Sequence, residues 1–302
     1  MKGWIADFLH HLLAQKGCSK RTEENYRKSL NNCVAFFSGR LGLREWTAVE
    51  TQHVRQWVAD MMDNGYAPAT VNCALSALRS FYKYLLREGR VEVDPARLVK
   101  NPKMPKRLPT FIKESEMDRL FAFYPFGEDY LGRRNYTILL LLYHTGLRAS
   151  ELLGLNVYDI DLAAHQLKVT GKGDKQRIVP FGDELAEALR AYFQLRLVHL
   201  QSVKSAAQEA VWLTQRGMRM SYEELREMVN TCLSSVTTQQ KRSPHVVRYS
   251  FATAMLANGA QLEAIQQLLG HESVATTAIY THTTLAELKA EYAQAHPRKG
   301  KK

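Results

Sequence analysis

Three prolines within nine residues interrupt this chain about one third of the way along its 302 residues, at Pro102, Pro105 and Pro109. A proline inside a helix removes a backbone hydrogen bond and clashes with the preceding turn, so no regular helix crosses this segment. Its three basic residues and its prolines favour an extended linker. The sequence therefore predicts a first domain over 1–100, a basic linker over 101–109, and a second domain over 110–302.

The first domain carries apolar residues at the helical period of 3.6 in four segments: 4–12, 26–37, 54–61 and 71–85. A glycine follows close to each segment, as expected for residues that end helices in the left-handed conformation. These glycines are Gly17, Gly39, Gly65 and Gly89. The pattern predicts a small, all-helical domain.

The second domain mixes helices with a little strand. Helices are expected over 114–123 and 135–144, and the second is apolar nearly all round, which is typical of a central core helix. Two short strands, 166–170 and 176–180, flank a glycine-rich turn at Gly173 and predict a β-hairpin. Helices resume at Asp183 and dominate to Gln294. The expected fold class is mainly α with a small β-sheet in the second domain.

The balance of charge indicates a polyanionic partner. The chain has 41 Lys and Arg against 30 Asp and Glu, a formal charge of +11. Residues 1–107 hold 18 basic and 10 acidic side chains, whereas the rest holds 23 and 20, four of the basic ones in the C-terminal tail. Several basic residues of the first domain could meet phosphates, unless they form only a solvated face: Lys20, Arg21, Arg27, Lys28, Arg79, Lys83 and Arg87.

Other features indicate a soluble, cytoplasmic protein. The longest apolar run, 138–143, is far shorter than the roughly 20 residues that span a bilayer. Charged residues interrupt the N-terminus too early for a signal peptide. The four cysteines are scattered without metal-binding spacing, and we expect buried, reduced thiols: Cys18, Cys33, Cys73 and Cys232.

Two arginines stand where chemistry is expected. Arg148 follows the central helix in Thr145-Gly146-Leu147-Arg148, so its cation lies close to the core and must be paired or must bind an anion. An ion pair with Glu151 is the plainer alternative. His245 and Arg248 share one face of a helix that Ser243 and Pro244 begin, and a helix N-terminus favours phosphate.

Three further residues are weaker candidates when taken singly. His271 follows Gly270, which is expected to end a helix, and a capping or surface role is the alternative. Lys172 lies between two glycines at the hairpin turn, where it could donate a proton, although a surface lysine is the usual expectation. Tyr280 is one of 14 tyrosines.

Together these residues follow the order found in one known family. The sequence resembles the tyrosine recombinases, the integrase family of site-specific DNA recombinases, and particularly their Xer-like bacterial members. The resemblance covers essentially the whole chain and rests on the segments TGLRASELLGL, TGKGDKQRIVP, SPHVVRYSFAT and LLGHESVATTAIYTH. One departure is Tyr249, where many members carry a histidine, and we expect altered packing there rather than lost activity.

The resemblance implies a fold, a reaction and a partner. The fold would be a two-domain, C-shaped DNA clamp with a helical core-binding domain and an α+β catalytic domain. Tyr280 would attack a DNA phosphodiester and form a 3′-phosphotyrosyl bond. The remaining catalytic residues would then be Arg148, Lys172, His245, Arg248 and His271. Neither a metal nor ATP is expected, since no phosphate-binding loop or paired acidic cluster is present.

The resemblance further implies a tetramer on two specific DNA sites, built from this chain alone or with a paralogous recombinase. The protein would then be cytoplasmic and nucleoid-associated. Its process would be chromosome dimer resolution or mobile-element integration. A short helix over 285–292 would dock on a neighbouring protomer, or else fold back on its own chain. Two other functions remain open, namely a DNA-binding or architectural protein without strand transfer and a type IB-like topoisomerase.

Overall fold

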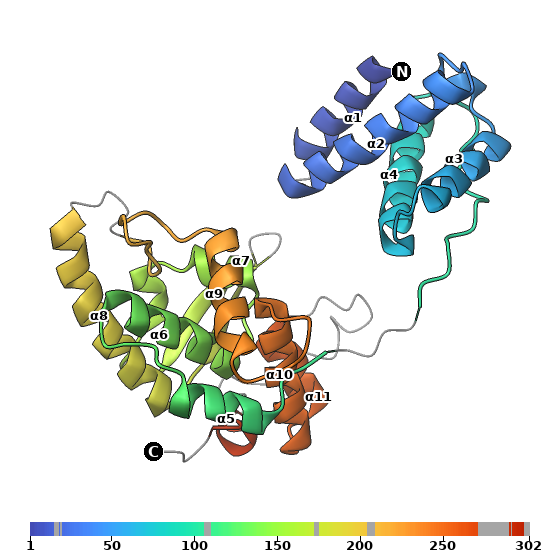
Figure 1. Ribbon diagram of the computed structural model, residues 1–302. Coiled ribbons are helices and arrows are strands. Elements are labelled where there is room, and N and C mark those ends of the chain that lie inside the picture. Colours follow the sequence, from blue (N-terminus) through green and yellow to red (C-terminus); the bar gives the residue numbers. More distant parts are fainter. Residues whose placement is uncertain are drawn as a thin grey trace. The chain divides into compact units, whose positions relative to one another are not determined.

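The computed structural model describes residues 1–14, 18, 20–105, 110–171, 175–203, 209–270, 290 and 292–298. The chain divides into two compact units, Met1–Arg107 and Leu108–Lys302 (Figure 1). The described elements are mainly helical, with one three-stranded sheet in the second unit. This agrees with the fold class that the sequence predicts. None of the described helices is long and apolar enough to cross a membrane.

The N-terminal unit is a bundle of helices around an aromatic core. Both α2 and α4 contact α1 and α3. Trp46 lies at the centre, with its ring 4.7 Å from that of Phe81, and its carbonyl accepts a hydrogen bond from the Tyr82 hydroxyl at 3.0 Å. The elements are α1 (Lys2–Ala14), α2 (Lys20–Arg40), the 3-10 turn η1 (Trp46–Ala48), α3 (Thr51–Asp63) and α4 (Pro68–Arg87).

Not every local prediction for this unit is correct. Gly65 and Gly89 have positive φ after α3 and α4, as predicted. Gly39 instead lies inside α2, and Gly42 takes the left-handed conformation, with the next amide donating to the Phe37 carbonyl at 2.9 Å. The helix runs on because Leu41 and Leu43 pack on the core just beyond its end. Gly17 lies outside the described residues.

The cysteine prediction is also partly wrong. Cys33 and Cys232 are buried, but Cys18 is half-buried and Cys73 is exposed. Cys73 follows the buried Val71 and precedes the buried Leu75 in sequence, but it lies on the outer face of α4. The helical pattern of the sequence therefore did not predict its exposure. All four thiols are free, as expected.

The C-terminal unit is built around α6, whose residues from Thr137 to Thr145 are all buried. α6 packs against both α8 and α10. The predicted central helix is therefore confirmed, although it begins five residues earlier than expected. The helices of this unit are α5 (Glu114–Phe123), α6 (Tyr130–Thr145), α7 (Ala149–Gly154), the 3-10 turn η2 (Val157–Asp159), α8 (Asp183–Val203), α9 (Tyr222–Ser234), α10 (Pro244–Ala257) and α11 (Leu262–Leu269).

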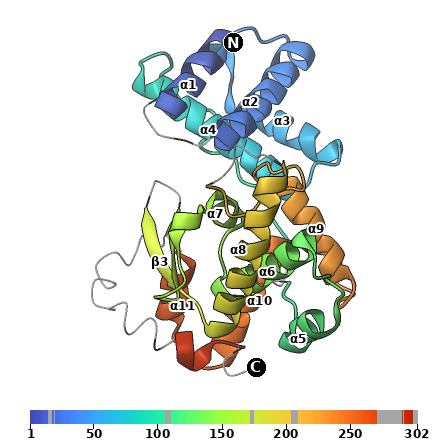
Figure 2. The ribbon, with the colours of Figure 1, turned by 90° about the vertical axis from the view of Figure 1, so that its left-hand side faces the viewer.

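A small antiparallel sheet lies at one side of this unit, next to α11 (Figure 2). Its strand order is β1-β2-β3, with β1 (Ile160–Asp161), β2 (Gln166–Thr170) and β3 (Gln176–Pro180). The last two are the predicted hairpin strands, whereas the two-residue β1 is too short for a sequence pattern to reveal. Val169 lies opposite Arg177 in the register. The predicted turn residue Gly173 lies outside the described residues.

The described C-terminal residues 292–298 pack on their own unit. Tyr292 and Ala295 join its hydrophobic core. The Arg298 guanidinium donates to both carboxylate oxygens of Glu184 and lies 4.8 Å above the Phe121 ring. Whether the helix over 285–292 docks on its own chain or on a neighbouring protomer stays open. The greater part of the segment 285–292 lies outside the described residues.

Candidate active site

The turn after α6 places Arg148 at the surface of the core. Gly146 ends α6 with φ of +59°, and a Cβ atom there would lie 2.5 Å from the Phe251 ring. Glycine is therefore needed both for the left-handed backbone and for the close approach. Arg148 is then the N-cap residue of α7. The side chain of Arg148 remains 40% exposed, so it reaches solvent from a fixed base.

Arg148 forms the ion pair that the sequence offered as the plainer alternative. Its Nη1 lies 2.8 Å from Oε1 of Glu151, and the other carboxylate oxygen accepts the Arg148 backbone N–H at 2.9 Å. Its Nη2 donates to the Gly270 carbonyl at 2.7 Å. The Arg148 guanidinium keeps donors for a further ligand, because only two of its five N–H groups bond within the described residues.

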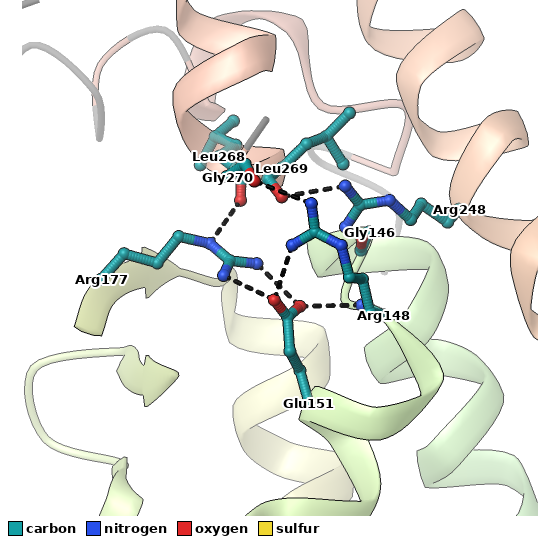
Figure 3. Close-up of polar contacts among 8 residues, drawn as sticks. All are labelled: Gly146, Arg148, Glu151, Arg177, Arg248, Leu268, Leu269 and Gly270. Atoms are coloured by element: carbon teal, nitrogen blue, oxygen red, sulfur yellow. Dashed lines mark hydrogen bonds and ion pairs between the residues drawn. The ribbon is translucent and has the colours of Figure 1, made fainter. Parts of the chain in front are cut away.

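Arg177 is a member of this cluster that the sequence reasoning missed (Figure 3). Its Nη1 and Nη2 donate to the two oxygens of Glu151 at 2.8 and 2.9 Å, and its Nε donates to the Leu268 carbonyl at 3.0 Å. A signal for it was present, since Arg177 lies two residues from the buried Val179 on β3, and side chains two apart share one face of a strand. A charge on an inward strand face must be paired.

Glu151 is nearly buried, with a side chain only 3% exposed, between the two arginines. Burial alone would raise the pKa of this carboxyl group. Hydrogen bonds from Arg177 and Arg148 outweigh burial and lower the pKa to about 2. Glu151 is therefore ionised at every physiological pH and provides a fixed negative charge between Arg177 and Arg148.

Arg248 comes from α10, where Ser243 is the N-cap and Pro244 the first residue, as predicted. It is 4% exposed, and its Nη1 and Nη2 donate to the carbonyls of Gly146 and Leu269 at 2.6 and 2.9 Å. Burial, followed by the positive charge of Arg148, lowers its pKa to about 10. The guanidinium thus remains charged at neutral pH.

His245 lies one turn before Arg248 and is exposed. Desolvation, then the charges of Arg248 and Arg148, lower its pKa below the ordinary 6.5. The imidazole is therefore mostly neutral at neutral pH and can accept a proton. The ring of Tyr249 lies 5.0 Å from the His245 ring, so this departure from the family pattern borders the site.

Three predicted residues are thus brought together, and three are not described. Arg148 and Arg248 meet at the end of α11, where one binds the Gly270 carbonyl and the other the Leu269 carbonyl. Lys172, His271 and Tyr280 lie outside the described residues. Two of these three residues directly follow glycines that border the cluster. Lys172 follows Gly171, and His271 follows Gly270.

The basic residues of the N-terminal unit fall into two groups. Arg79 donates to the carbonyls of Ala96 and Val99 and so holds the segment after α4, and its phosphate contact stays a prediction. Arg27 pairs with Glu23, and Arg87 with Glu88. The others are exposed, and no ion pair joins them to the described residues: Lys20, Arg21, Lys28 and Lys83.

Comparison with known proteins identifies the family. Residues 110–287 match the model of the phage integrase family, and residues 5–89 match the phage integrase N-terminal SAM-like domain. The chain belongs to the phage integrase family.

Two similar curated proteins carry recombinase names. Tyrosine recombinase XerC of Chlorobaculum tepidum is 37% identical over 98% of this chain and 94% of its own. Tyrosine recombinase XerD of Lacticaseibacillus casei is 37% identical over 99% and 100%.

Solved structures show the same fold. XerH site-specific recombinase bound to difH substrate has a TM-score of 0.70 and 19% identity, covering 95% of this chain and 93% of its own. The Tn1549 transposon integrase with transposon right end DNA has a TM-score of 0.71 and 18% identity, covering 95% and 98%. The two curated relatives, 37% identical over nearly the whole chain, together with the family match, show that this phage integrase family member is a site-specific tyrosine recombinase of DNA. Neither a topoisomerase nor a purely architectural protein is favoured.

Proposed function

We propose that Tyr280 is the nucleophile of this recombinase. Its hydroxyl oxygen attacks a DNA phosphorus, the bond from phosphorus to the 5′ oxygen breaks, and a 3′-phosphotyrosyl bond forms. The proton of the tyrosyl hydroxyl passes to His245, and Lys172 gives a proton to the leaving 5′ oxygen. Because the new ester replaces the old one, a 5′-hydroxyl of a partner strand reverses the step without ATP.

Arg148 and Arg248 stabilise the charge on the non-bridging oxygens, and His271 adds a hydrogen bond. Charge on these oxygens is the main demand of a phosphoryl transition state, and donors fixed in advance meet it without rearrangement. The observation that supports this assignment is the convergence of the two arginines at the end of α11. Backbone carbonyls and one carboxylate hold both guanidiniums, so their charges stay in place before DNA arrives.

In this proposal both units bind the DNA duplex and act together as a clamp. The exposed lysines and Arg21 of the N-terminal unit and the basic linker contact phosphates, while the C-terminal unit addresses the scissile phosphate. Four protomers, identical or with a paralogous recombinase, join two specific sites. The process that this reaction serves is chromosome dimer resolution or mobile-element integration. We place the protein in the cytoplasm, on the nucleoid.

Covalent trapping tests the proposal. Fragmented DNA of the source organism is incubated with the chain, and the fragments that become covalently attached are sequenced to define the target site. A duplex of that sequence is then nicked beside the cleavage position, so that a short strand diffuses away and the adduct accumulates. Wild type is expected to form the adduct, and Tyr280→Phe is expected to form none.

Tyr249→Phe serves as the matched control, since it removes one hydroxyl from the tyrosine whose ring lies 5.0 Å from that of His245 and leaves the proposed nucleophile. It is expected to retain the adduct. An equal yield from Tyr280→Phe and wild type would overturn the assignment of Tyr280.

A further inference from the structure

We propose that Arg177 is a positioning residue for recombination, which holds Glu151 and the end of α11 so that Arg148 faces the scissile phosphate. The inference rests on the proposed role of Arg148. Arg177 belongs to β3, Arg148 precedes α7, and their common partners come from α7 and α11. One guanidinium therefore connects three segments that the chain brings together from far apart.

Arg177 and Arg148 hold the same groups. Both donate to Oε1 of Glu151 at 2.8 Å, and Arg177 alone donates from its side chain to Oε2, at 2.9 Å. At the end of α11, Arg177 binds the Leu268 carbonyl and Arg148 binds the Gly270 carbonyl, two residues on. A displacement of Arg177 is therefore transmitted to both anchors of Arg148.

The contact at Gly270 is close. This residue has φ of +62°, and a Cβ atom placed there would lie 3.0 to 3.2 Å from the Arg177 guanidinium. Only a glycine lets the guanidinium pack against the backbone at this distance. The left-handed turn that presents the Gly270 carbonyl to Arg148 is thus covered directly by Arg177.

The charge balance explains why a second arginine is needed. A carboxylate with a side chain only 3% exposed is costly to bury unless it is fully paired. Without Arg177, the Glu151 carboxylate would pair with Arg148 alone, and the net charge of that pair would be zero. With Arg177 present, the three groups sum to one positive charge, so Arg148 keeps an attraction for phosphate.

The site also calls for arginine rather than lysine. The two parallel bonds to Glu151 and the third bond from Nε need a planar fork with donors in fixed directions. Lysine would retain the charge but could not bond the two carboxylate oxygens and the Leu268 carbonyl in the same geometry. Arg177→Lys therefore separates the positioning of Glu151 from the local charge.

The test is a single-turnover cleavage assay on the nicked duplex described above, with protein at saturating concentration. Arg177→Lys is expected to lower the rate constant of adduct formation by about 10- to 100-fold, because small misplacements of catalytic groups have effects of this size. Affinity for the duplex is expected to stay within about threefold of wild type, because Arg177 is not proposed to touch DNA. Unfolded molecules reduce the amplitude and leave the rate constant unchanged.

The matched control is Arg133→Lys. Arg133 also pairs with a glutamate in the same unit, but Glu128 is 83% exposed, so loss of this surface pair is expected to leave cleavage unchanged. A second comparison makes Arg177→Lys in a Glu151→Gln background. If Arg177 acts through Glu151, its substitution there is expected to cost much less than in wild type.

The outcomes separate this proposal from the proposed function. Wild-type adduct together with an unchanged rate constant in Arg177→Lys would overturn the positioning role and leave the nucleophile assignment intact. An equal rate loss in the wild-type and Glu151→Gln backgrounds would overturn the route through Glu151. Absence of adduct from wild type would contradict the proposed function itself.

Discussion

The two units of this recombinase place positive charge in opposite ways. In the N-terminal unit the lysines of α2 and α4 are exposed, and no ion pair joins Lys20, Lys28 or Lys83 to the described residues. In the C-terminal unit Arg148, Arg177 and Arg248 are held by a carboxylate and by backbone carbonyls. Exposed, unpaired cations are suited to binding the phosphate backbone of any DNA sequence. Cations held in place by hydrogen bonds are suited to stabilising one phosphate in its transition state.

The comparison predicts that substitutions in the two units affect different quantities. Removing a fixed cation should reduce the rate constant of cleavage with little change in affinity. Removing an exposed cation should reduce affinity and its salt dependence with little change in the rate constant at saturation. An opposite result in any of the following experiments would contradict this difference between the two units.

The largest effect is expected for Arg148→Gln. This substitution removes a charge from the scissile phosphate, and loss of one such donor typically slows a reaction by about 100- to 1,000-fold. Glu151 keeps its two bonds to Arg177, so the unit should stay folded. The rate constant of adduct formation and the dissociation constant for the duplex, measured together, check the prediction. A large loss of affinity with an unchanged rate constant would contradict it.

The next effect concerns pH. The pKa of His245 lies below 6.5, because desolvation and then Arg248 and Arg148 disfavour its charged form. In the proposed mechanism a neutral imidazole accepts the tyrosyl proton, so cleavage should fall as pH decreases through a value below 6.5 and stay level above it, up to mildly alkaline pH. The pH profile of the cleavage rate constant measures this. His245→Gln should be slower by roughly 10- to 100-fold and should lose this acid limb. An acid limb that persists in His245→Gln would assign the titration to another group.

The smallest effect is expected for Lys28→Gln combined with Lys83→Gln. Loss of two phosphate contacts should weaken duplex binding about tenfold at low salt and reduce the slope of log affinity against log salt by about two. Binding measured from low to moderate salt checks this. Arg40→Gln is the control on α2, because Arg40 already pairs with Asp60 at 2.6 Å. An equal loss from Arg40→Gln would show that unpaired charge is not what matters.

Sequence patterns predicted the elements of this fold better than they predicted the contacts. The periodicity of α6 and the alternation of β2 and β3 are local, so both could be read from the residues and are confirmed. The left-handed turn at Gly270 was likewise implied by its position after a helix. β1 escaped notice because two residues carry no period, and Gly39 misled because packing extended α2 past it.

The site shows the same division. Arg148, His245 and Arg248 were proposed from sequence. The structure brings the two arginines together at the end of α11, and their charges lower the pKa of His245. Arg177 was missed because its partner Glu151 lies 26 residues away in sequence, and a bond over that distance follows from the fold. Glu151 itself was recognised only as a partner of Arg148, since sequence spacing reveals a pair within one turn but not a carboxylate shared by two arginines.

The most direct test of the central claim is to identify the atom that joins protein to DNA. The trapped wild-type adduct is digested with nuclease, and the remaining nucleotide is located by mass spectrometry. Trypsin leaves Tyr249 and Tyr280 in one peptide, because no Lys or Arg lies between Arg248 and Lys289, so a second cleavage after Glu272 is needed. The account predicts a nucleotide on Tyr280, attached through its 3′ phosphate, and a free 5′-hydroxyl on the released strand. A nucleotide on any other residue, or a 5′ linkage, would contradict it.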